Sequence, residues 1–324
     1  MRIAVSGSIA TDHLMTFPGR FVDQLLPDQL ANLSVSFLVD DLDVRRGGVA
    51  GNICFGLGVL GLSPVLIGAV GSDFADYRSW LESHGVDTSG VRVSETRQTA
   101  RFVCTTDTEQ NQIASFYPGA MTEAREIDLG LLGQLDLVMV GPNDPSAMAA
   151  HTTSCRNRGV RFAADPSQQL ASLDGAAIRN LLTGAEFLFC NAYESALLES
   201  KTGLSPAEVL DTVGTRVTTH GAQGIVISKA GEPEIRVGVV RATRLTDPTG
   251  VGDAFRAGFL AGQSWDLTLE RSAQVGALMA TLCVESLGPQ EYDVDAATAR
   301  TRLATAYGED AAAEIAALLP SSGH

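Results

Sequence analysis

Short apolar runs alternate along most of the chain with longer segments that repeat apolar residues at helical spacing. Apolar runs of about four to eight residues, bounded by turn-forming residues, are typical of buried strands. The expected strands are residues 2–7, 65–70, 135–140, 160–164, 187–190, 216–219 and 225–228, and the expected helices include 46–60, 73–84, 148–159 and a single amphipathic helix over 296–319. This alternation predicts an α/β fold with a mostly parallel, doubly wound sheet and right-handed crossovers.

Three apolar segments depart from this rhythm. Residues 35–39, followed by Leu42 and Val44, predict a kinked strand, and residues 99–106 and 112–117 predict a hairpin around a polar turn. We expect these strands to form a separate small β-sheet that acts as a lid. The predicted domains are an α/β core, residues 1–10, 47–96 and 121–324, and a lid, residues 11–46 and 97–120.

Polar loops follow several of the expected core strands. They cover residues 8–12, 165–169, 191–194 and 219–224, and a fifth polar loop covers 247–253. In open α/β sheets, ligands bind outside the carboxyl ends of the strands. The sequence therefore predicts one binding site, along one edge of the sheet, to which these loops contribute.

The fifth loop, Asp247-Pro248-Thr249-Gly250-Val251-Gly252-Asp253, leads into a helical pattern. A glycine turn that enters a helix leaves backbone N–H groups free to bind an anion, and glycine lets a phosphate approach the backbone. A carboxylate beside such a site fits a general base that takes the proton of an attacking hydroxyl. The alternative is that Asp253 only stabilises the start of the helix.

Two further side chains near glycines are candidates for sugar contacts. Asp12, after the first strand, has the short carboxylate that accepts hydrogen bonds from two neighbouring hydroxyls, although a turn aspartate is the alternative. Asn52 lies in the first turn of the helix expected over residues 46–60, where its side chain could contact a hydroxyl.

Residues 56–61 spell the dinucleotide-binding pattern G-x-G-x-x-G. That pattern must follow a strand and open a helix, whereas here it ends a helix and precedes a strand. We interpret these glycines as sites of close helix packing. The chain has no G-x-x-x-x-G-K-[ST] motif, which excludes a P-loop kinase.

Composition narrows the possible partners. The 324 residues include 23 Lys and Arg against 38 Asp and Glu, giving a net charge of −15. Nucleic acid and anionic membranes are therefore not expected partners, and phosphate binding requires a local site. The five cysteines show no metal-binding spacing, no segment is apolar enough to cross a bilayer, and the chain begins directly with a strand pattern. We expect a cytoplasmic protein with free buried thiols.

These motifs resemble the ribokinase-type, or phosphofructokinase B-type, carbohydrate kinase family over nearly the whole chain. Residues 247–259 resemble the C-terminal signature of the family, residues 47–52 its N-terminal signature, and residues 191–194 its N-x-x-E motif. The first signature lacks the lysine of typical ribokinases, and Val251 replaces a frequent alanine. Within the family the chain looks most like the ribokinase-like bacterial adenosine kinases, on the segments 7–14, 34–40, 98–102, 113–121 and 164–169.

The resemblance implies a three-layer α/β/α core with a β-sheet lid, and the transfer of the γ-phosphoryl group of ATP to the 5′-hydroxyl of adenosine. It implies that Asp253 is the base and that the amides from Gly250 through Gly252 to Asp253 form the anion hole. The implied nucleoside contacts are Asp12, Gly48 and Asn52 to the ribose, Phe102 and Phe116 to the adenine, and Ser8, Ser36, Gln168 and Gln169 around the nucleoside.

The family also implies how ATP is held. Asn191 and Glu194 would organise Mg²⁺ and the phosphates through water, and Asp247 and Thr249 would contribute to a monovalent-cation site, as for K⁺. The implied lining of the ATP site is Thr219, Gly221, Gly224 and Gly252. Ribokinase-like members commonly form homodimers through the lid, which we expect here.

Alternatives stay open at this point. The same chemistry could act on ribose, another sugar, or inosine and guanosine, and the fold could serve a non-catalytic nucleoside-binding protein. Phe102 and Phe116 suit the flat face of a base, but they could be sheet core instead. Arg256, one turn into the last motif, could reach a phosphate, or it could be a surface or salt-bridged arginine.

Overall fold

The structure is a computed structural model that describes residues 1–25 and 34–320. Within these residues the core contains a nine-stranded sheet with the order β13-β12-β11-β10-β9-β8-β1-β4-β5. The pairs from β11 through β1 to β5 are parallel, and β12 and β13 are antiparallel to their neighbours. The strands are β1 (Ile3–Ser6), β4 (Val65–Val70), β5 (Val91–Val93), β8 (Leu137–Val140), β9 (Arg161–Ala164), β10 (Phe187–Asn191), β11 (Thr215–Thr219), β12 (Ile225–Ser228) and β13 (Ile235–Val237).

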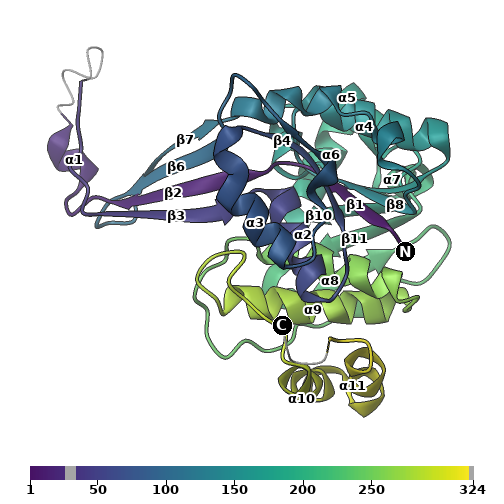
Figure 1. Cartoon of the computed structure of the whole chain (residues 1–324). Helices are drawn as coiled ribbons and strands as arrows, with labels where there is room; N and C mark the ends of the chain where they lie inside the picture. The colour runs from purple at the N-terminus through teal and green to yellow at the C-terminus, as the bar shows by residue number, and fades with distance from the viewer. Residues whose placement is uncertain (26–33, 321–324) are drawn as a thin grey trace.

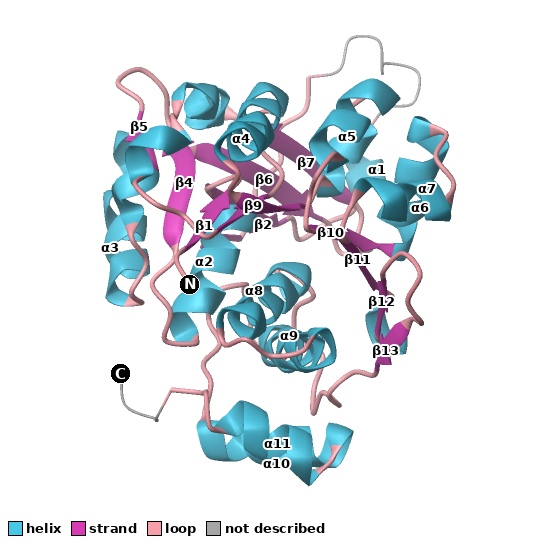
Figure 2. Cartoon of the chain, turned by 90° about the vertical axis from the view of Figure 1, so that its right-hand side faces the viewer, coloured by secondary structure: helices cyan, strands magenta, loops and turns pink. Residues whose placement is uncertain are grey.

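Helices cover both faces of this sheet, which confirms the expected α/β class and three layers (Figure 2). Alternate residues of each strand point to opposite faces, so Ile3 and Val5 join one apolar cluster and Ala4 joins the other. One layer is α2 (Val49–Val59), α3 (Ala75–Ser83), α8 (Val251–Ser264) and α9 (Leu269–Val284), backed by α10 (Ala296–Tyr307) and α11 (Glu309–Ala316); the other is α4 (Pro145–Arg158), α5 (Gly175–Leu182), α6 (Ala192–Thr202) and α7 (Pro206–Thr212).

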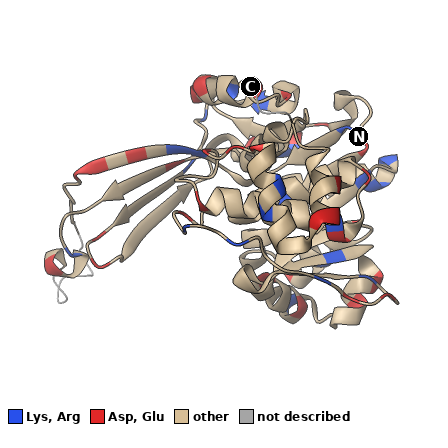
Figure 3. Ribbon diagram, turned by 90° about the horizontal axis from the view of Figure 1, so that it is seen from below, with Lys and Arg blue, Asp and Glu red and all other residues tan. Residues whose placement is uncertain are grey.

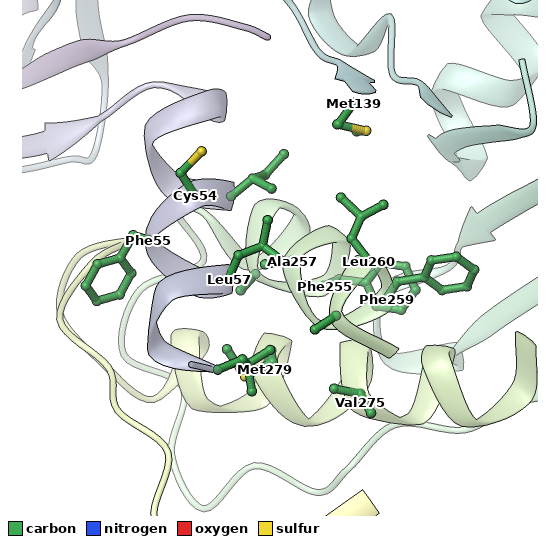
Figure 4. Packing of buried hydrophobic residues seen from close by; sticks show 14 of the residues in the cluster. Cys54, Phe55, Leu57, Met139, Phe255, Ala257, Phe259, Leu260, Val275 and Met279 are labelled. Atoms are coloured by element: carbon green, nitrogen blue, oxygen red, sulfur yellow. The ribbon is translucent and has the colours of Figure 1, made fainter. Parts of the chain in front are cut away.

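Helix α8 lies in the middle of the first layer, which fixes its position relative to the sheet. Figure 4 shows Leu260 of α8 between Met139 of the sheet and Met279 of α9, all buried in one cluster. The G-x-G-x-x-G residues lie in and just after α2, as close packing requires: a Cβ on Gly56 would lie 2.7 Å from the Cβ of Ala257. These glycines end a helix and precede a strand, so they are not a dinucleotide fingerprint, as predicted.

The second sheet projects from the core (Figure 1). Among the described residues it has the order β3-β2-β6-β7, with β2 and β6 parallel and the outer pairs antiparallel. Its strands are β2 (Ala10–Thr16), β3 (Asp41–Gly47), β6 (Ala100–Thr106) and β7 (Gln112–Tyr117), and α1 (Phe21–Gln24) lies at its outer end. We propose that this sheet and the core are the two domains of the chain; residues 26–33 of the predicted lid lie outside the described residues.

Three predicted elements were wrong in detail. Residues 35–39 form no strand: the strand is β3, and Phe37 instead packs on the rings of Phe17 and Phe21, 5.1 and 4.9 Å away, at the outer end of the lid. Asp12 lies inside strand β2 and not in a loop. The single C-terminal helix is two, α10 and α11, because Gly308 between them has φ 90°.

Among the described residues, no helix has the length and apolar character needed to cross a bilayer. Lys and Arg are scattered among Asp and Glu over the core and the lid, as Figure 3 shows for the ribbon seen from below.

Candidate active site

The polar loops meet at one edge of the core sheet, as predicted. The parallel strands β1, β8, β9, β10 and β11 are neighbours, so their carboxyl ends lie side by side. Asn191 and Thr219, both predicted to serve ATP, are direct partners in the register of β10 and β11. The loop with Gln168 and Gln169 follows β9, and Ser8 follows β1 further along the same edge. The predicted ATP residues and the predicted nucleoside residues therefore occupy different parts of one edge.

The start of helix α8 lies beside α2, where Asn52 contacts Asp253, and beside the end of β9, where Asp165 contacts Arg256. Its N-cap is Gly250, with φ 77°, and no side chain caps the helix. By contrast, Asp144 caps α4 and Asp174 caps α5 with their carboxylates. Because the first N–H groups of a helix have no partner within it, this uncapped glycine turn can bind an anion. The arrangement agrees with the predicted anion hole at Gly250, Gly252 and Asp253.

Asp253 lies in the first turn of α8, and Asn52 of α2 donates a hydrogen bond of 2.8 Å from its Nδ2 to the Asp253 Oδ2. The carboxylate is part-buried at the loop edge and is not enclosed in the core. Burial raises the pKa of Asp253 to about 6, opposed by the charge of Arg256 and by the bond from Asn52. A carboxylate with a pKa closer to neutrality than usual is a better general base.

The orientation of Asn52 is set by two residues that the sequence did not point to. Gln290 donates from its Nε2 to the Asn52 Oδ1 at 2.9 Å and to the Tyr77 hydroxyl at 2.5 Å. The Tyr77 hydroxyl donates in turn to the carbonyl of Gly47 at 2.9 Å. Since the Asn52 oxygen accepts from Gln290, its amide nitrogen faces Asp253. No local motif reveals this contact, because Gln290 and Asn52 are 238 positions apart.

The lid brings three predicted substrate residues into one row. Asp12 of β2 is in register with Phe102 of β6, which is in register with Phe116 of β7. Phe116 is 51% exposed, so it is not a core residue of the sheet and its ring is available to a ligand. This row favours the interpretation of the two phenylalanines as ligand contacts.

The end of this row at Asp12 is strongly charged. Arg45 of β3 is paired with Asp12 in the register and makes an ion pair of 2.7 Å with Asp247. Figure 3 shows β3 with acidic residues on its outer part and arginines where the lid joins the core. Burial raises the pKa of Asp12 to about 6; Arg45 opposes the shift and Asp247 adds to it.

These two carboxylates predict the acid side of the pH profile. Because both pKa values are raised to about 6, each carboxylate becomes protonated as the pH falls below that value. Protonated Asp253 cannot act as a base, and protonated Asp12 is a poorer hydrogen-bond acceptor. If Asp12 and Asp253 must both be ionised, log kcat/KM should fall with decreasing pH at a limiting slope of two. In Asp12→Asn one titrating group is gone, so the limiting slope should be one, at a lower plateau. Initial rates at a subsaturating concentration of the acceptor over pH about 4.5 to 8 check this; an unchanged slope in the variant would contradict it.

Gly48 and Ser8 lie together at the start of α2. Gly48 has φ 87°, and a Cβ there would lie 2.6 Å from the backbone oxygen of Ser8 and from the nitrogen of Ala10, so only glycine fits. The Ser8 hydroxyl accepts the N–H of Val49 at 3.0 Å. This tight junction joins the first core strand, the lid and α2.

The remaining residues predicted to contact the nucleoside do not all lie near the site. Gln169 donates to the carbonyl of Asn143 at 2.8 Å and so ties the loop after β9 to the loop after β8, while Gln168 is exposed beside it. Ser36 is exposed in the irregular segment near the outer end of the lid, and the structure does not bring it to the other residues. Its role stays a prediction.

At the predicted ATP end, Asn191 and Glu194 form a capping box at the start of α6. The Asn191 side chain accepts the Glu194 N–H, and the Glu194 Oε2 accepts the Asn191 N–H, both at 2.8 Å. Among the described residues, the other oxygen, Oε1, accepts only the Ser167 hydroxyl at 3.3 Å, which leaves it able to accept from water. Among the described residues no group of three acidic, His or Cys side chains could hold a metal. One carboxylate with a free oxygen fits hydrated Mg²⁺ bound mainly to phosphates.

Beyond α6, Gly221 and Gly224 both have positive φ in the turn after β11, next to Thr219. Asp247 accepts N–H groups from Thr249 at 2.9 Å and Gly288 at 3.2 Å besides pairing with Arg45. These donors already occupy both carboxylate oxygens, so Asp247 has little capacity left for a monovalent cation, and that site stays a prediction.

Arg256 forms the salt bridge that the sequence left as one of two alternatives. Its Nε and Nη2 lie 2.6 and 2.8 Å from the carboxylate oxygens of Asp165, at the end of β9. Asp165 itself was within a predicted loop, yet nothing in the sequence linked it to a residue 91 positions away.

The chain is similar to known proteins over most of its length. Residues 9–296 match the model of the pfkB family carbohydrate kinases. The nucleoside kinase of Burkholderia thailandensis in complex with inosine superposes with a TM-score of 0.83 at 35% identity, covering 94% of this chain and 98% of that one. The nucleoside kinase of Methanocaldococcus jannaschii is 29% identical over 247 residues, 75% of this chain and 80% of that protein.

A third relative is matched over a short region only. The adenosine kinase of Saccharomyces cerevisiae is 34% identical over 76 residues, 23% of this chain and 22% of that protein. The family model covers most of the chain, and the predicted family resemblance is thereby confirmed: the chain belongs to the pfkB family of carbohydrate kinases.

Proposed function

We propose that this protein is an adenosine kinase, which transfers the γ-phosphoryl group of ATP to the 5′-hydroxyl of adenosine and gives AMP and ADP, a step of purine salvage. The observation that carries the proposal is the carboxylate of Asp253, held by Asn52 at the uncapped glycine turn of α8. The coarser activity, an ATP-dependent nucleoside kinase, agrees with its relatives.

The mechanism follows from the positions of these groups. Asp253 accepts the proton of the 5′-hydroxyl as its oxygen attacks the γ-phosphorus in line with the leaving ADP oxygen. The amides at Gly250 to Asp253 stabilise the charge on the transferred phosphoryl group. Asp12 and Asn52 orient the ribose. Glu194 would hold Mg²⁺ through water beside the phosphates of ATP, and the ion would neutralise part of the phosphate charge.

Adenine recognition is assigned to the lid. Phe102 and Phe116 present flat rings on the same face as Asp12, and stacking of a base on an aromatic ring contributes about 1 to 3 kcal/mol. A sugar without a base would leave these rings exposed. The second candidate function keeps this base-binding row and accepts hypoxanthine as well, because the Burkholderia thailandensis relative was solved with inosine.

Release of ADP with adenosine, inosine, guanosine and ribose as acceptors separates these candidates. We expect kcat/KM to be highest for adenosine and lowest for ribose. A higher value for inosine than for adenosine would establish the second candidate, and a higher value for ribose would contradict base recognition by the lid.

Truncating Phe116 to alanine should raise the KM for adenosine about 10-fold or more, by loss of one stacking contact, with the KM for ATP almost unchanged. Ile113→Ala is the matched control. It shortens an exposed side chain of the same strand on the opposite face of the lid. If both variants raised the KM for adenosine equally, or if the KM for ATP rose with it, the placement of adenine on the lid would be wrong.

We also propose that the protein is a cytoplasmic homodimer joined through the lid. The five cysteines are free and buried, which suits a reducing compartment. The face of the lid opposite Phe116 carries Leu42, Val44, Ile113 and Tyr117, each about half exposed. Covering such an apolar face with a second copy is favourable. A mass in sedimentation equilibrium of twice the 34.0 kDa chain would support this, and a monomer at enzyme-assay concentration would refute it.

A further inference from the structure

The ion pair between Asp165 and Arg256 is the most deeply buried charged contact beside the candidate site. The two side chains are 1% and 9% exposed, and the pair joins the loop after β9 to α8. A buried ion pair is weak evidence of a contribution to stability, because desolvation of both ions offsets their attraction. Its position therefore needs another explanation.

The third nitrogen of the guanidinium group points elsewhere. Nε and Nη2 face Asp165, whereas Nη1 lies against Gly252: a Cβ built on Gly252 would be 2.8 Å from it. In the described part of the chain, Nη1 has no hydrogen-bond acceptor. Gly252 itself is exposed at the start of α8. The edge of the guanidinium group that is not used by Asp165 thus lies at the same turn as the anion-binding amides.

The charges around this turn show why a cation is needed there. Asp253, Asp165 and Glu194 all interact with Arg256 and raise its pKa, although burial opposes them. Three carboxylates would repel the phosphates of ATP from the turn. Arg256 neutralises Asp165 and leaves one N–H edge for a further anion, and a guanidinium group suits oxygens of a phosphoryl group.

We propose that Arg256 is a catalytic residue of phosphoryl transfer, which donates from Nη1 to a non-bridging oxygen of the γ-phosphoryl group while Asp165 holds the guanidinium plane in position. The inference rests on the site assigned under the proposed function. In the step, the bond from O5′ to phosphorus forms, the bond from phosphorus to the ADP oxygen breaks, and the 5′ proton passes to Asp253. Arg256 keeps its protons throughout and supplies positive charge.

The double variant Arg256→Gln with Asp165→Asn tests this proposal. It replaces the buried ion pair by two neutral amides of similar size, so that no unpaired charge is left in the interior. We expect kcat for adenosine to fall about 10²- to 10³-fold, as for loss of one donor to a developing anion. The Kd for adenosine should stay within about threefold, and the affinity for ADP with aluminium fluoride and adenosine, which imitates the transition state, should fall about as much as kcat.

Two results would overturn it. One is a folded double variant, by thermal melting, with kcat within about threefold of wild type. The other is a kcat that recovers fully at high pH, because Arg256 would then act only by lowering the pKa of Asp253. If the double variant does not fold, Arg256→Lys decides: it keeps the positive charge at Asp165 but loses Nη1, so an unchanged kcat would refute the contact.

Failure of the site assignment gives a different pattern. If Asp253→Asn kept its activity, the assigned site would be wrong whatever Arg256 does. If Asp253→Asn were inactive and the double variant were fully active, only the role of Arg256 would be wrong.

Discussion

Replacing Asp253 by asparagine should lower kcat for adenosine about 10³- to 10⁴-fold, close to the full contribution of a positioned general base. Asparagine has nearly the same shape and can still pair with Asn52 after rotation of its amide, but it cannot accept the 5′ proton. The backbone turn at Gly250 does not depend on the side chain of Asp253, because no side chain caps α8. ATP binding, measured by calorimetry in the absence of nucleoside, should therefore change little.

Asp76→Asn is a matched control for this variant. Asp76 is also an acidic residue in the first turn of a helix, α3, and it is exposed. Removing the exposed negative charge of Asp76 near a positive helix end should cost about 0.3 to 1 kcal/mol of stability. Asp253→Asn should not destabilise the fold, because the raised pKa of Asp253 means that its charged form is disfavoured there. Only Asp253→Asn should affect turnover. A loss of less than about tenfold in the Asp253 variant would show that the proton leaves by another route.

The core of the fold was predictable because its signals are local. Each parallel strand is a short apolar run, and each is followed by a polar loop, so the sheet and the edge that carries the site follow from the order of these segments. The glycine turn before Asp253 and the hairpin strands with Phe102 and Phe116 were predictable for the same reason. In each case the residues that form the feature are close in sequence.

The features that could not be predicted depend on partners far away in the sequence. Arg45 meets Asp247 across 202 positions, and no periodicity reveals that the lid is fastened to the core there. The segment around Phe37 has a strand-like pattern, but it forms no strand. The ring of Phe37 packs instead on the rings of Phe17 and Phe21. Local propensity indicates that an apolar residue will be buried. It indicates less well which part of the fold will bury it.

The position of Gly250 gives the second large effect, because both its backbone angle and its surroundings exclude a side chain. Its φ is 77°, and a Cβ would collide with the Cβ of Pro289, next to the Gln290 that orients Asn52. In Gly250→Ala the turn must shift, which displaces the amides proposed to bind the anion and the contact between Asn52 and Asp253. We expect kcat/KM for adenosine to fall about 10²- to 10³-fold, as when a donor to the transition state is misplaced.

Gly203→Ala separates this effect from backbone strain alone. Gly203 ends α6 with φ 70°, and a Cβ there would have no atom within 4 Å. Gly203→Ala should lose about 1 to 2 kcal/mol of unfolding free energy to the left-handed conformation, measured by urea denaturation. Gly250→Ala should lose at least as much, because its Cβ also meets Pro289. Only Gly250→Ala should also lose turnover at a temperature where both proteins are folded. Equal turnover in the two variants would mean that the start of α8 tolerates displacement, and the phosphoryl group would then have to be stabilised elsewhere.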